Sequence, residues 1–565
     1  MFSASYAMIF YGLLYFSIVT VYGVKDVPRA IGVIQPILLF FVFGISRLFA
    51  RYLFIGIHKR KEKMSLKPRA LIYGAGSAGL QLESVLAKSY EMNVVGFLDD
   101  DKSLHGQVSQ GKSIFSPQDL GYLIASKQVS HVLLAIPSTN RNMRLQILRN
   151  IEEHKVIVRT LPSISELVEG RVTTSDVRDL DIDDLLARDQ VVPDYKLLDK
   201  NINSKVVLVT GAGGSIGSEL CRQIIKSNPE KVLLVDISEY ALYKIHAELE
   251  EISIKTNSDD NIKIIPLLAS VQDDNRMMEI LSTWKPDTLY HAAAYKHVPL
   301  VEQNVCEGIK NNVFGTLIIT QAAIKNDVSN VVLISSDKAV RPTNVMGASK
   351  RLAELCLQAL FADSKTHKTK LSMVRFGNVL DSSGSVIPKF KKQILKGGPV
   401  TLTHSEVTRY FMTIPEAAQL VIQASAMTEG CDVFLLEMGK PVKIKDLIKR
   451  IIALSGLSIQ DENNPDGDIK ILITGLRPGE KLYEELLLGD NPQPTKHTKI
   501  KRAQDPFIPW HQLESELNYL KVLVHQKKTK EVLNILQKLV TGYKPTDKIV
   551  DQVFTQQVNL GNIKK

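Results

Sequence analysis

Cysteine is scarce in this chain, and its four copies, Cys221, Cys306, Cys356 and Cys431, lie far apart. None forms a Cys-x-x-Cys pair, so the sequence predicts no disulfide framework and no metal site, and free thiols fit a reducing compartment. A recognised nucleic-acid-binding motif is also lacking, although the net charge is +10. Much of the basic excess flanks the hydrophobic N-terminus or lies near the C-terminus. We therefore expect membrane headgroups and nucleotide phosphates as the counter-charges, and no nucleic acid.

Charge is missing altogether from the 21 residues between Ala4 and Val24. A helix of this length spans about 30 Å, the thickness of a bilayer core. A second run, Ile31 to Ala50, is apolar apart from Gln35, Ser46 and Arg47. We expect a transmembrane helical hairpin with a basic flank over residues 1–60, and the positive flank places the rest of the chain in the cytoplasm. The alternative is that the second run lies at the membrane surface.

A glycine-rich turn after a short apolar strand predicts a first Rossmann-like domain over residues 67–192. The turn is Gly74-x-Gly76-x-x-Gly79, and a later strand at residues 94–98 ends in Asp99, about where a ribose-binding acid would lie. A single glycine fingerprint is a weak signal, and the rest of this region shows no catalytic constellation. The domain is therefore predicted either to bind a nucleotide or to serve as a structural or regulatory module.

A second glycine turn, Gly211-x-x-Gly214-x-x-Gly217, gives a stronger signal because a strand precedes it and a clear helical pattern follows. Such glycines let the backbone approach a pyrophosphate, whose charge then lies at the helix N-terminus. The next strand ends in Asp236, whose carboxylate would accept hydrogen bonds from a ribose and repel a 2'-phosphate, so NAD is favoured over NADP. The cofactor-binding residues expected in this part are Gly211, Gly214, Ser215, Ile216, Gly217 and Asp236.

Strands and helices alternate through residues 203–490, which predicts a parallel sheet with its site at the carboxyl ends of the strands. Residues 491–565 are expected to form C-terminal helices and a tail, with helical spacing from Leu513 to Tyr543. The predicted fold class is therefore α/β, with two Rossmann-like doubly wound parallel-sheet domains in series behind the N-terminal transmembrane hairpin.

Asp337 and Lys338 follow a predicted buried strand at residues 330–335, and Met346 and Lys350 lie one helical turn apart a little further on. The arrangement resembles a short-chain dehydrogenase active site in which a Met replaces the Tyr. The Tyr would use a neighbouring Lys to lower its pKa and take a hydroxyl proton, and Met cannot do this. An adjacent carboxylate and amine suit the removal of water from a sugar better than a simple oxidation. The alternative is that both residues end a strand and face solvent.

Six motifs in order support a wider family resemblance. From Thr210 to about Leu487 the chain resembles the extended short-chain dehydrogenases that modify nucleotide sugars, and within them the membrane-bound 4,6-dehydratases of bacterial surface polysaccharide synthesis, the CapD type. The motifs are TGAGGSIG at 210–217, HAAAYKH at 291–297, SDKA at 336–339, PTNVMGASK at 342–350, RFGNVL at 375–380 and RPGEK at 477–481. The resemblance implies a multi-pass protein of the bacterial inner membrane with a cytoplasmic catalytic domain, and a homo-oligomer.

The resemblance also implies a reaction. The family converts UDP-N-acetylglucosamine, or a close relative, to a 4-keto-6-deoxy sugar by C4 oxidation, elimination of water across C5 and C6, and hydride return to C6. By position Lys338 would be the C5 base and Asp337 the C6 acid, while Ser336 would hydrogen-bond the C4 hydroxyl. For this Lys338 must be partly neutral, which burial and the nearby Lys350 cation would promote, and Asp337 must hold a proton.

Further roles follow from the same resemblance. Lys350 would hold the nicotinamide ribose, and Ala292 would lie against the cofactor. Side chains that would bind the UDP-sugar are Lys296, Asn378, Arg409 and Arg477, the two Arg forks suiting a pyrophosphate. The alternatives are exposed surface arginines and a lysine solvated at the strand end.

Two departures limit the resemblance. Ser270 stands where the family has an acidic residue after the third strand, which puts one adenine contact in doubt, and two N-terminal helices are expected where relatives often carry four.

Two other functions stay open. A 4-epimerase would return the hydride to C4, and a non-catalytic nucleotide-sensing scaffold would explain Met346 as a mark of lost activity.

Overall fold

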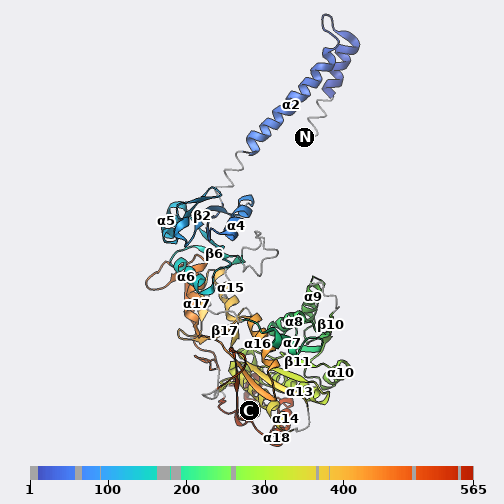
Figure 1. The fold of residues 1–565 in the computed structure, drawn as a ribbon, viewed down its shortest axis with the longest axis vertical. Helices are drawn as coiled ribbons and strands as arrows, with labels where there is room; N and C mark the ends of the chain where they lie inside the picture. Colours follow the sequence, from blue (N-terminus) through green and yellow to red (C-terminus); the bar gives the residue numbers. More distant parts are fainter. Residues whose placement is uncertain are drawn as a thin grey trace. The chain divides into compact units, whose positions relative to one another are not determined.

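The computed structural model describes residues 10–56, 67–89, 91–161, 178–179, 192–255, 262–363, 368–380, 382, 384–485, 492–544 and 549–563. The chain divides into two compact units (Figure 1). Unit 1 comprises Met1–Ser138 and Ile157–Asp179, and unit 2 comprises Thr139–Val156 and Leu180–Lys565. The basic flank predicted at residues 59–63 and the boundary predicted at residues 490–491 lie outside the described residues.

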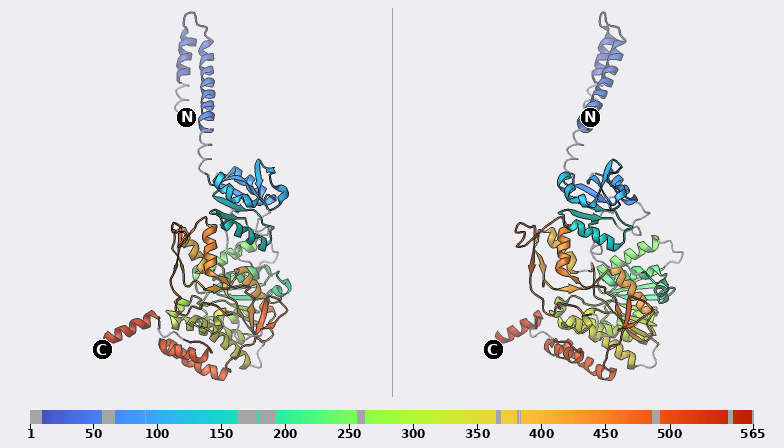
Figure 2. Two further views of the ribbon diagram at one scale, coloured as in Figure 1. Left: turned by 90° about the vertical axis from the view of Figure 1, so that its left-hand side faces the viewer. Right: turned by 60° about the vertical axis from the view of Figure 1, so that its left-hand side comes forward.

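The N-terminal apolar runs form two helical segments that pair with each other (Figure 2). Residues 10–16 and η1 (Ser17–Gly23) lie along α2 (Ile31–Gly56), where Tyr11 donates a hydrogen bond to Gln35 at 3.3 Å. The prediction that they cross a membrane is wrong, because no helix in the described part of the chain has the length and apolar character that a crossing requires. Within the described residues the first run is helical over residues 10–23.

This correction removes the lipid bilayer as a predicted partner and the predicted multi-pass placement in the inner membrane. Lack of charge was the main sequence signal for both. An uncharged run, however, says nothing of where its helix begins, and α2 contains Pro36 in its interior.

Unit 1 holds the first Rossmann-like sheet, whose strand order is β3-β4-β2-β1-β5-β6-β7. The parallel strands are β1 (Arg69–Tyr73), β2 (Asn93–Leu98), β4 (Lys112–Phe115), β5 (His131–Leu134) and β6 (Ile157–Thr160), with antiparallel edges β3 (Val108–Ser109) and β7 (Arg178–Asp179). The predicted glycine turn joins β1 to α4 (Ser77–Lys88), and Asp99 accepts a hydrogen bond of 2.7 Å from the amide of Ala75 in that turn. The predicted Rossmann opening is confirmed, and nucleotide binding here stays a prediction.

Unit 2 is built on a 9-stranded sheet of order β10-β9-β8-β11-β12-β13-β18-β23-β22. The parallel strands are β8 (Val206–Thr210), β9 (Lys231–Asp236), β10 (Lys263–Leu268), β11 (Thr288–His291), β12 (Asn330–Ile334), β13 (Lys370–Arg375) and β18 (Cys431–Leu436), and β22 (Gln493–Pro494) and β23 (Ile500–Ala503) are antiparallel. The order reverses between β8 and β11. A crevice opens at this reversal, outside the carboxyl ends of the strands, and the order is the doubly wound one that was predicted.

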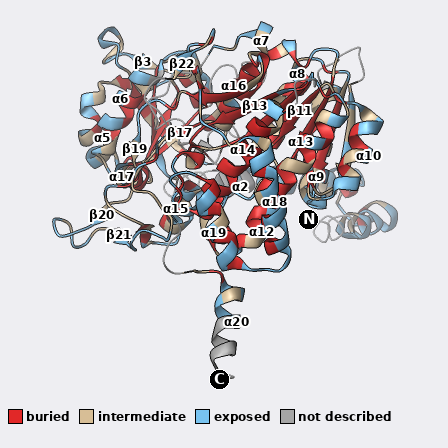
Figure 3. Cartoon of the chain, turned by 90° about the horizontal axis from the view of Figure 1, so that it is seen from below, coloured by how far each residue is buried: buried red, intermediate tan, exposed pale blue. Residues whose placement is uncertain are grey.

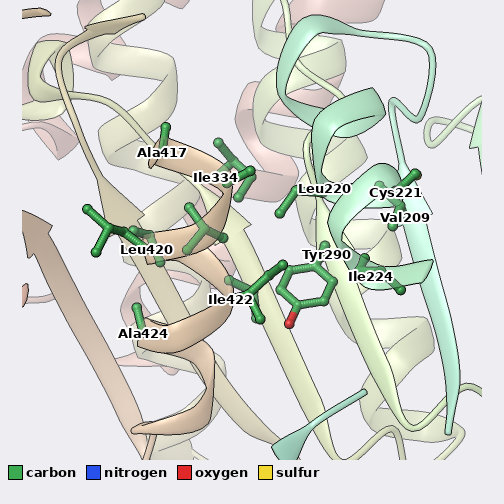
Figure 4. Close-up of a cluster of buried hydrophobic side chains, with 14 of the residues drawn as sticks. Val209, Leu220, Cys221, Ile224, Tyr290, Ile334, Ala417, Leu420, Ile422 and Ala424 are labelled. Carbon is green, nitrogen blue, oxygen red and sulfur yellow. The ribbon is translucent and has the colours of Figure 1, made fainter. Parts of the chain in front are cut away.

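Apolar side chains alternate between the two faces of this sheet, and helices cover both faces (Figure 3). Val207 and Val209 of β8 pack toward α8 (Ser215–Lys226) and α16 (Ile414–Ala426), while Leu208 packs on the opposite face with α10 (Asp274–Trp284), α13 (Gly315–Lys325) and α14 (Val345–Asp363). Figure 4 shows the first face, with the Tyr290 ring between α8 and α16. Because both faces are covered, the central strands β8 and β12 are buried along their whole length.

Smaller elements complete unit 2. The sheet β15-β21-β20 (Val400–Leu402, Ile469–Ile473, Ile459–Gln460) lies beside α15 (Val386–Leu395) and α17 (Ile444–Leu454). The helices expected between Leu513 and Tyr543 are confirmed as α18 (Trp510–His525) and α19 (Thr529–Leu539). Both pack on α14 through buried leucines, so the C-terminal region supports a helix of the main domain.

Candidate active site

A cavity of about 1210 Å³ opens at the carboxyl ends of the central strands of unit 2. Its walls come from the turn after β8, the ends of β11, β12 and β13, the start of α14, and the segments around α15 and β16 (Thr408–Arg409). The predicted site residues that line it are Gly214, Ser215, Ile216, Gly217, Ala292, Lys296, Ser336, Lys338, Met346, Lys350, Asn378, Arg409 and Arg477. Gly211, Asp236 and Asp337 lie outside this lining.

The glycine turn is shaped for the close approach of a phosphate group. Gly211 has a φ of +65°, and a Cβ at Gly217 would lie 2.0 Å from the Gly211 carbonyl oxygen, so a side chain fits at neither position. Asp236 stabilises the turn, because its carboxylate accepts 2.9 Å hydrogen bonds from the amides of Gly213 and Ser238. The turn leads directly into the N-terminus of α8 at the cavity wall, which is where a dinucleotide pyrophosphate binds in such folds.

Asp337 and Lys338 begin the short helix η9 (Asp337–Ala339) directly after β12. The Asp337 carboxylate is fully buried, and one oxygen accepts hydrogen bonds from Ser336 Oγ at 2.9 Å and Lys338 Nζ at 3.0 Å. Its other oxygen, Oδ2, has no hydrogen-bond partner among the described residues. Lys338 Nζ also donates to Asn378 Oδ1 at 3.1 Å. The pair therefore faces the cavity through the lysine, and the alternative of a solvent-facing pair is wrong.

A second carboxylate lies against Lys338. Glu484 Oε1 is 3.8 Å from Lys338 Nζ and 3.8 Å from Arg409 Nε, and its side chain is 4% exposed. Burial alone would lower the pKa of Lys338, but the charges of Asp337 and Glu484 outweigh it and raise that pKa. This differs from the lowered value that we expected from burial and Lys350. The reason is the second carboxylate, which comes from a distant part of the sequence.

Met346 and Lys350 both line the cavity from the first turns of α14, one turn apart as predicted. Met346 is 3% exposed and offers only its thioether. Lys350 Nζ donates a 2.8 Å hydrogen bond to the carbonyl of Ile334 at the end of β12. Burial lowers the Lys350 pKa to about 8, although Glu354 acts in the opposite direction. The lysine is therefore fixed beside Asp337 and Lys338 with a charge that is easily lost.

The two predicted phosphate-binding arginines differ in their surroundings. The guanidinium group of Arg409 pairs with Glu480 at 3.2 Å and also with Glu484, so carboxylates already contact it. Arg477 is exposed at the cavity, and its guanidinium has no hydrogen bond or ion pair with any residue that the structure describes. Lys296 also lies at the rim and is exposed. Arg477 and Lys296 are therefore the more available cations at this cavity.

Sequence reasoning missed three polar residues that shape the site. They are Glu480, Glu484 and Asn312. The Asn312 side chain hydrogen-bonds both the amide and the carbonyl of Tyr295 and so holds the loop after β11. A signal was present for the two glutamates, because Glu480 is part of the RPGEK motif and Glu484 follows it within a few residues. Only the tertiary structure shows that this segment runs against η9 and β16.

The fold and the cavity define a Rossmann-type dinucleotide-binding protein of the extended short-chain dehydrogenase kind. Residues 207–505 match the family described as polysaccharide biosynthesis protein. The capsular polysaccharide biosynthesis protein CapD of Staphylococcus aureus is 42% identical over 83% of this chain and 76% of that protein. The probable polysaccharide biosynthesis protein EpsC of Bacillus subtilis is 43% identical over 79% and 72%. The UDP-glucose 4-epimerase of Rickettsia canadensis is 31% identical over 58% and 89%.

The chain therefore belongs to the polysaccharide biosynthesis protein family, and within it to the CapD type of nucleotide-sugar-modifying enzymes. The family resemblance found in the sequence motifs is confirmed.

Proposed function

We propose that this chain is a UDP-N-acetylglucosamine (UDP-HexNAc) 4,6-dehydratase, which makes a UDP-4-keto-6-deoxy sugar for surface polysaccharide or glycan synthesis. The observation that carries the proposal is the hydrogen-bonded pair of Asp337 and Lys338 at the cavity, opposite a helix on which Met346 leaves no phenolic base. An acid and a base side by side suit the loss of water from adjacent carbons. Membership of the CapD type supports the substrate class.

The cofactor in this proposal is NAD. The glycine turn leaves room for a pyrophosphate at the start of α8, Ala292 and Lys350 line the adjoining wall, and Asp236 places a carboxylate next to the turn. A carboxylate there disfavours the 2'-phosphate of NADP. When bound, the nicotinamide supplies the hydride acceptor for C4 and the hydride donor for C6. The chain's own residues then need only bind the sugar and move protons.

Each proton transfer has a candidate side chain. Lys338 takes the C5 proton, Asp337 gives a proton to the departing C6 hydroxyl, and Ser336 holds the C4 hydroxyl. Asp337 Oδ2 is buried and lacks a hydrogen-bond partner among the described residues, so this oxygen is the one left to meet the C6 hydroxyl. Asn378, Lys296, Arg409 and Arg477 bind the nucleotide-sugar, with Arg477 as the arginine most available to the pyrophosphate.

The second candidate is a 4-epimerase, which the likeness to the Rickettsia canadensis UDP-glucose 4-epimerase favours. An epimerase oxidises and reduces the same carbon and has no hydroxyl to expel, so it has no use for an acid beside Lys338.

The test is the product formed by the purified full chain from UDP-N-acetylglucosamine in heavy water. We expect a product lighter than the substrate by one water, apart from added deuterium, and proton NMR should show deuterium at C5. A product of unchanged mass would support the epimerase instead. No turnover by the native chain, with turnover appearing in Met346→Tyr, would support the nucleotide-sensing scaffold.

A further inference from the structure

We infer that Glu484 is the positioning residue of the site: it orients Lys338 toward the cavity and balances the positive charge that Lys338 gains when it takes the C5 proton. This inference rests on the proposed function and deepens it. It concerns a residue that lies outside the cavity lining and contacts the site through Lys338 and Arg409.

The geometry around Lys338 supports this role. Nζ has Asp337 Oδ1 at 3.0 Å on one side, Asn378 Oδ1 at 3.1 Å and Glu484 Oε1 at 3.8 Å. Three oxygen atoms from separate parts of unit 2 thus fix one amine. A base that is held by a third group is the arrangement in which nucleophiles and bases are commonly activated in enzymes.

The two carboxylates beside Lys338, those of Asp337 and Glu484, have different roles in this proposal. Asp337 must hold a proton if it is to release the C6 hydroxyl as water, so it cannot at that moment be the counter-ion of an ammonium. Glu484 is then the remaining carboxylate beside Lys338 in the described part of the chain. The Oε2 atom of Glu484 is buried and has no hydrogen-bond partner among those residues.

Burial and the charged groups near Glu484 shift the pKa of its carboxyl group in opposite directions. Burial raises the pKa of its carboxyl group, and so does the charge of Asp337, whereas Lys338, Arg409 and Lys481 lower it. The pKa of Glu484 is raised overall, with burial as the largest cause, and the three cations act against that rise. The groups that face Lys338 are therefore Asp337 from η9, Glu484 from the segment after the RPGEK motif, and Arg409 from β16, whose charge opposes the two carboxylates.

The proton transfers balance without a further reactant. The Lys338 amine takes the C5 proton and becomes an ammonium opposite Glu484. The electrons of the C5–H bond form the C5=C6 double bond, and the C6–O bond breaks as the hydroxyl accepts the Asp337 proton and leaves as water. Later reprotonation of C5 by the ammonium returns Lys338 to the amine, and the proton that the C4 hydroxyl loses on oxidation restores the proton of Asp337.

The experiment compares Glu484→Gln with Glu485→Gln, a matched control because Glu485 is the next residue, is exposed, and pairs with Arg341 at 3.4 Å instead of Lys338. Without the Glu484 charge the pKa of Lys338 falls, so the acidic limb of the kcat profile moves to lower pH by about one unit or more. On the alkaline plateau kcat falls by about 100-fold, with KM changed by less than about threefold. Glu484→Asp should recover part of kcat.

A second readout needs no turnover. Competitive acetylation of native protein, with the modified lysines measured by mass spectrometry, gives the pH at which the Lys338 amine becomes neutral. We expect that pH to fall in Glu484→Gln and to stay at the wild-type value in Glu485→Gln. Equal titration in wild type and Glu484→Gln, in protein with a native melting temperature, overturns the inference. If the wild type releases no water from the sugar but the Lys338 titration still shifts, the proposed function fails and the pairing of Glu484 with Lys338 stands.

Discussion

Asp337 is a carboxylate in an unusual position, because it is fully buried at the end of a strand and only one of its oxygens has partners among the described residues. A buried oxygen without a hydrogen-bond partner costs free energy of folding. Such a cost is acceptable where that oxygen takes part in a reaction. Asp337 and Lys338 are therefore best understood together as one acid–base unit.

The first prediction concerns this acid. In Asp337→Asn the group that protonates the C6 hydroxyl is lost while its shape is kept, so kcat should fall by about 100- to 10,000-fold. KM should change little, because Asn keeps the size and shape of the side chain. Lys338 remains, so substrate recovered from heavy water should still carry deuterium at C5. Asp274→Asn, an exposed position on α10, is the control, and wild-type kcat in Asp337→Asn would exclude Asp337 as the acid.

The second prediction is a pH dependence of stability that comes from Lys350. Its pKa is lowered to about 8 in the folded chain, whereas a free lysine titrates near about 10.4. Between these pH values the unfolded chain binds more protons, so the free energy of unfolding rises with pH by about 1.4 kcal/mol per unit. Below about pH 8 the full cost of the buried ammonium, about 3 kcal/mol, is present.

Lys350→Met removes this contribution. The free energy of unfolding of wild type minus that of Lys350→Met should therefore increase by about 2 kcal/mol between pH 7.5 and pH 9.5, as measured by denaturant unfolding. Lys244→Met at an exposed position of α9 (Glu239–Lys255) is the control. Parallel curves for wild type and Lys350→Met would mean that Lys350 keeps an ordinary pKa.

At the scale of elements, α14 is the helix that joins the site to the core. Its Glu354 is fully buried and accepts hydrogen bonds from Ser335 at the end of β12, from Arg351 on the same helix, and from Arg375 at the end of β13. Asp505 pairs with both arginines. This network fixes the register of α14 against the two strands whose ends carry the site, and so places Met346 and Lys350.

The third prediction follows from that network. Glu354→Ala leaves a buried arginine with one fewer counter-charge, which should cost about 3–5 kcal/mol of folding free energy and lower the melting temperature. Glu279→Ala on α10 removes an exposed partner of Arg276 and should cost less than about 1 kcal/mol. Equal effects of the two substitutions would show that the buried network contributes no more than a surface pair.

At the scale of the whole molecule, the C-terminal region is part of the structure that supports the site. Leu513, Leu517 and Leu520 of α18 and Leu536 of α19 are buried in one cluster with Met346, Leu352 and Leu355 of α14. Family motifs do not extend to this region. It nevertheless completes the hydrophobic core on the outer side of the site helix.

The fourth prediction is that this cluster affects the site from a distance. Leu520 is fully buried, so Leu520→Ala should cost about 2–5 kcal/mol. Because the cluster includes Met346, the variant should also retain less nicotinamide on purification. Val522→Ala on the exposed face of the same helix is the control, with Val522 49% exposed. A destabilised Leu520→Ala that retains the cofactor like wild type would show that α14 is held without α18.

Several elements could be predicted from local pattern alone. The glycine turn after β8, the strand that ends before Ser336 and the one-turn spacing of Met346 and Lys350 follow from periodicity, and all are found in the structure. The membrane-spanning hairpin was predicted by the same kind of reasoning and was wrong, because no helix in the described part of the chain is long and apolar enough to cross a membrane. Arg409 was assigned to the pyrophosphate, but Glu480 and Glu484 pair with it.

By itself the sequence determined the fold class of unit 2, the family, and the acid and amine at the end of β12, because these depend on contiguous residues whose spacing is fixed by helix and strand geometry. Only the tertiary structure decided that Glu484 lies against Lys338 and that α18 covers α14. Those contacts join segments far apart in the chain, and the electrostatic effect of one charge on another depends on their distance in space and not in sequence.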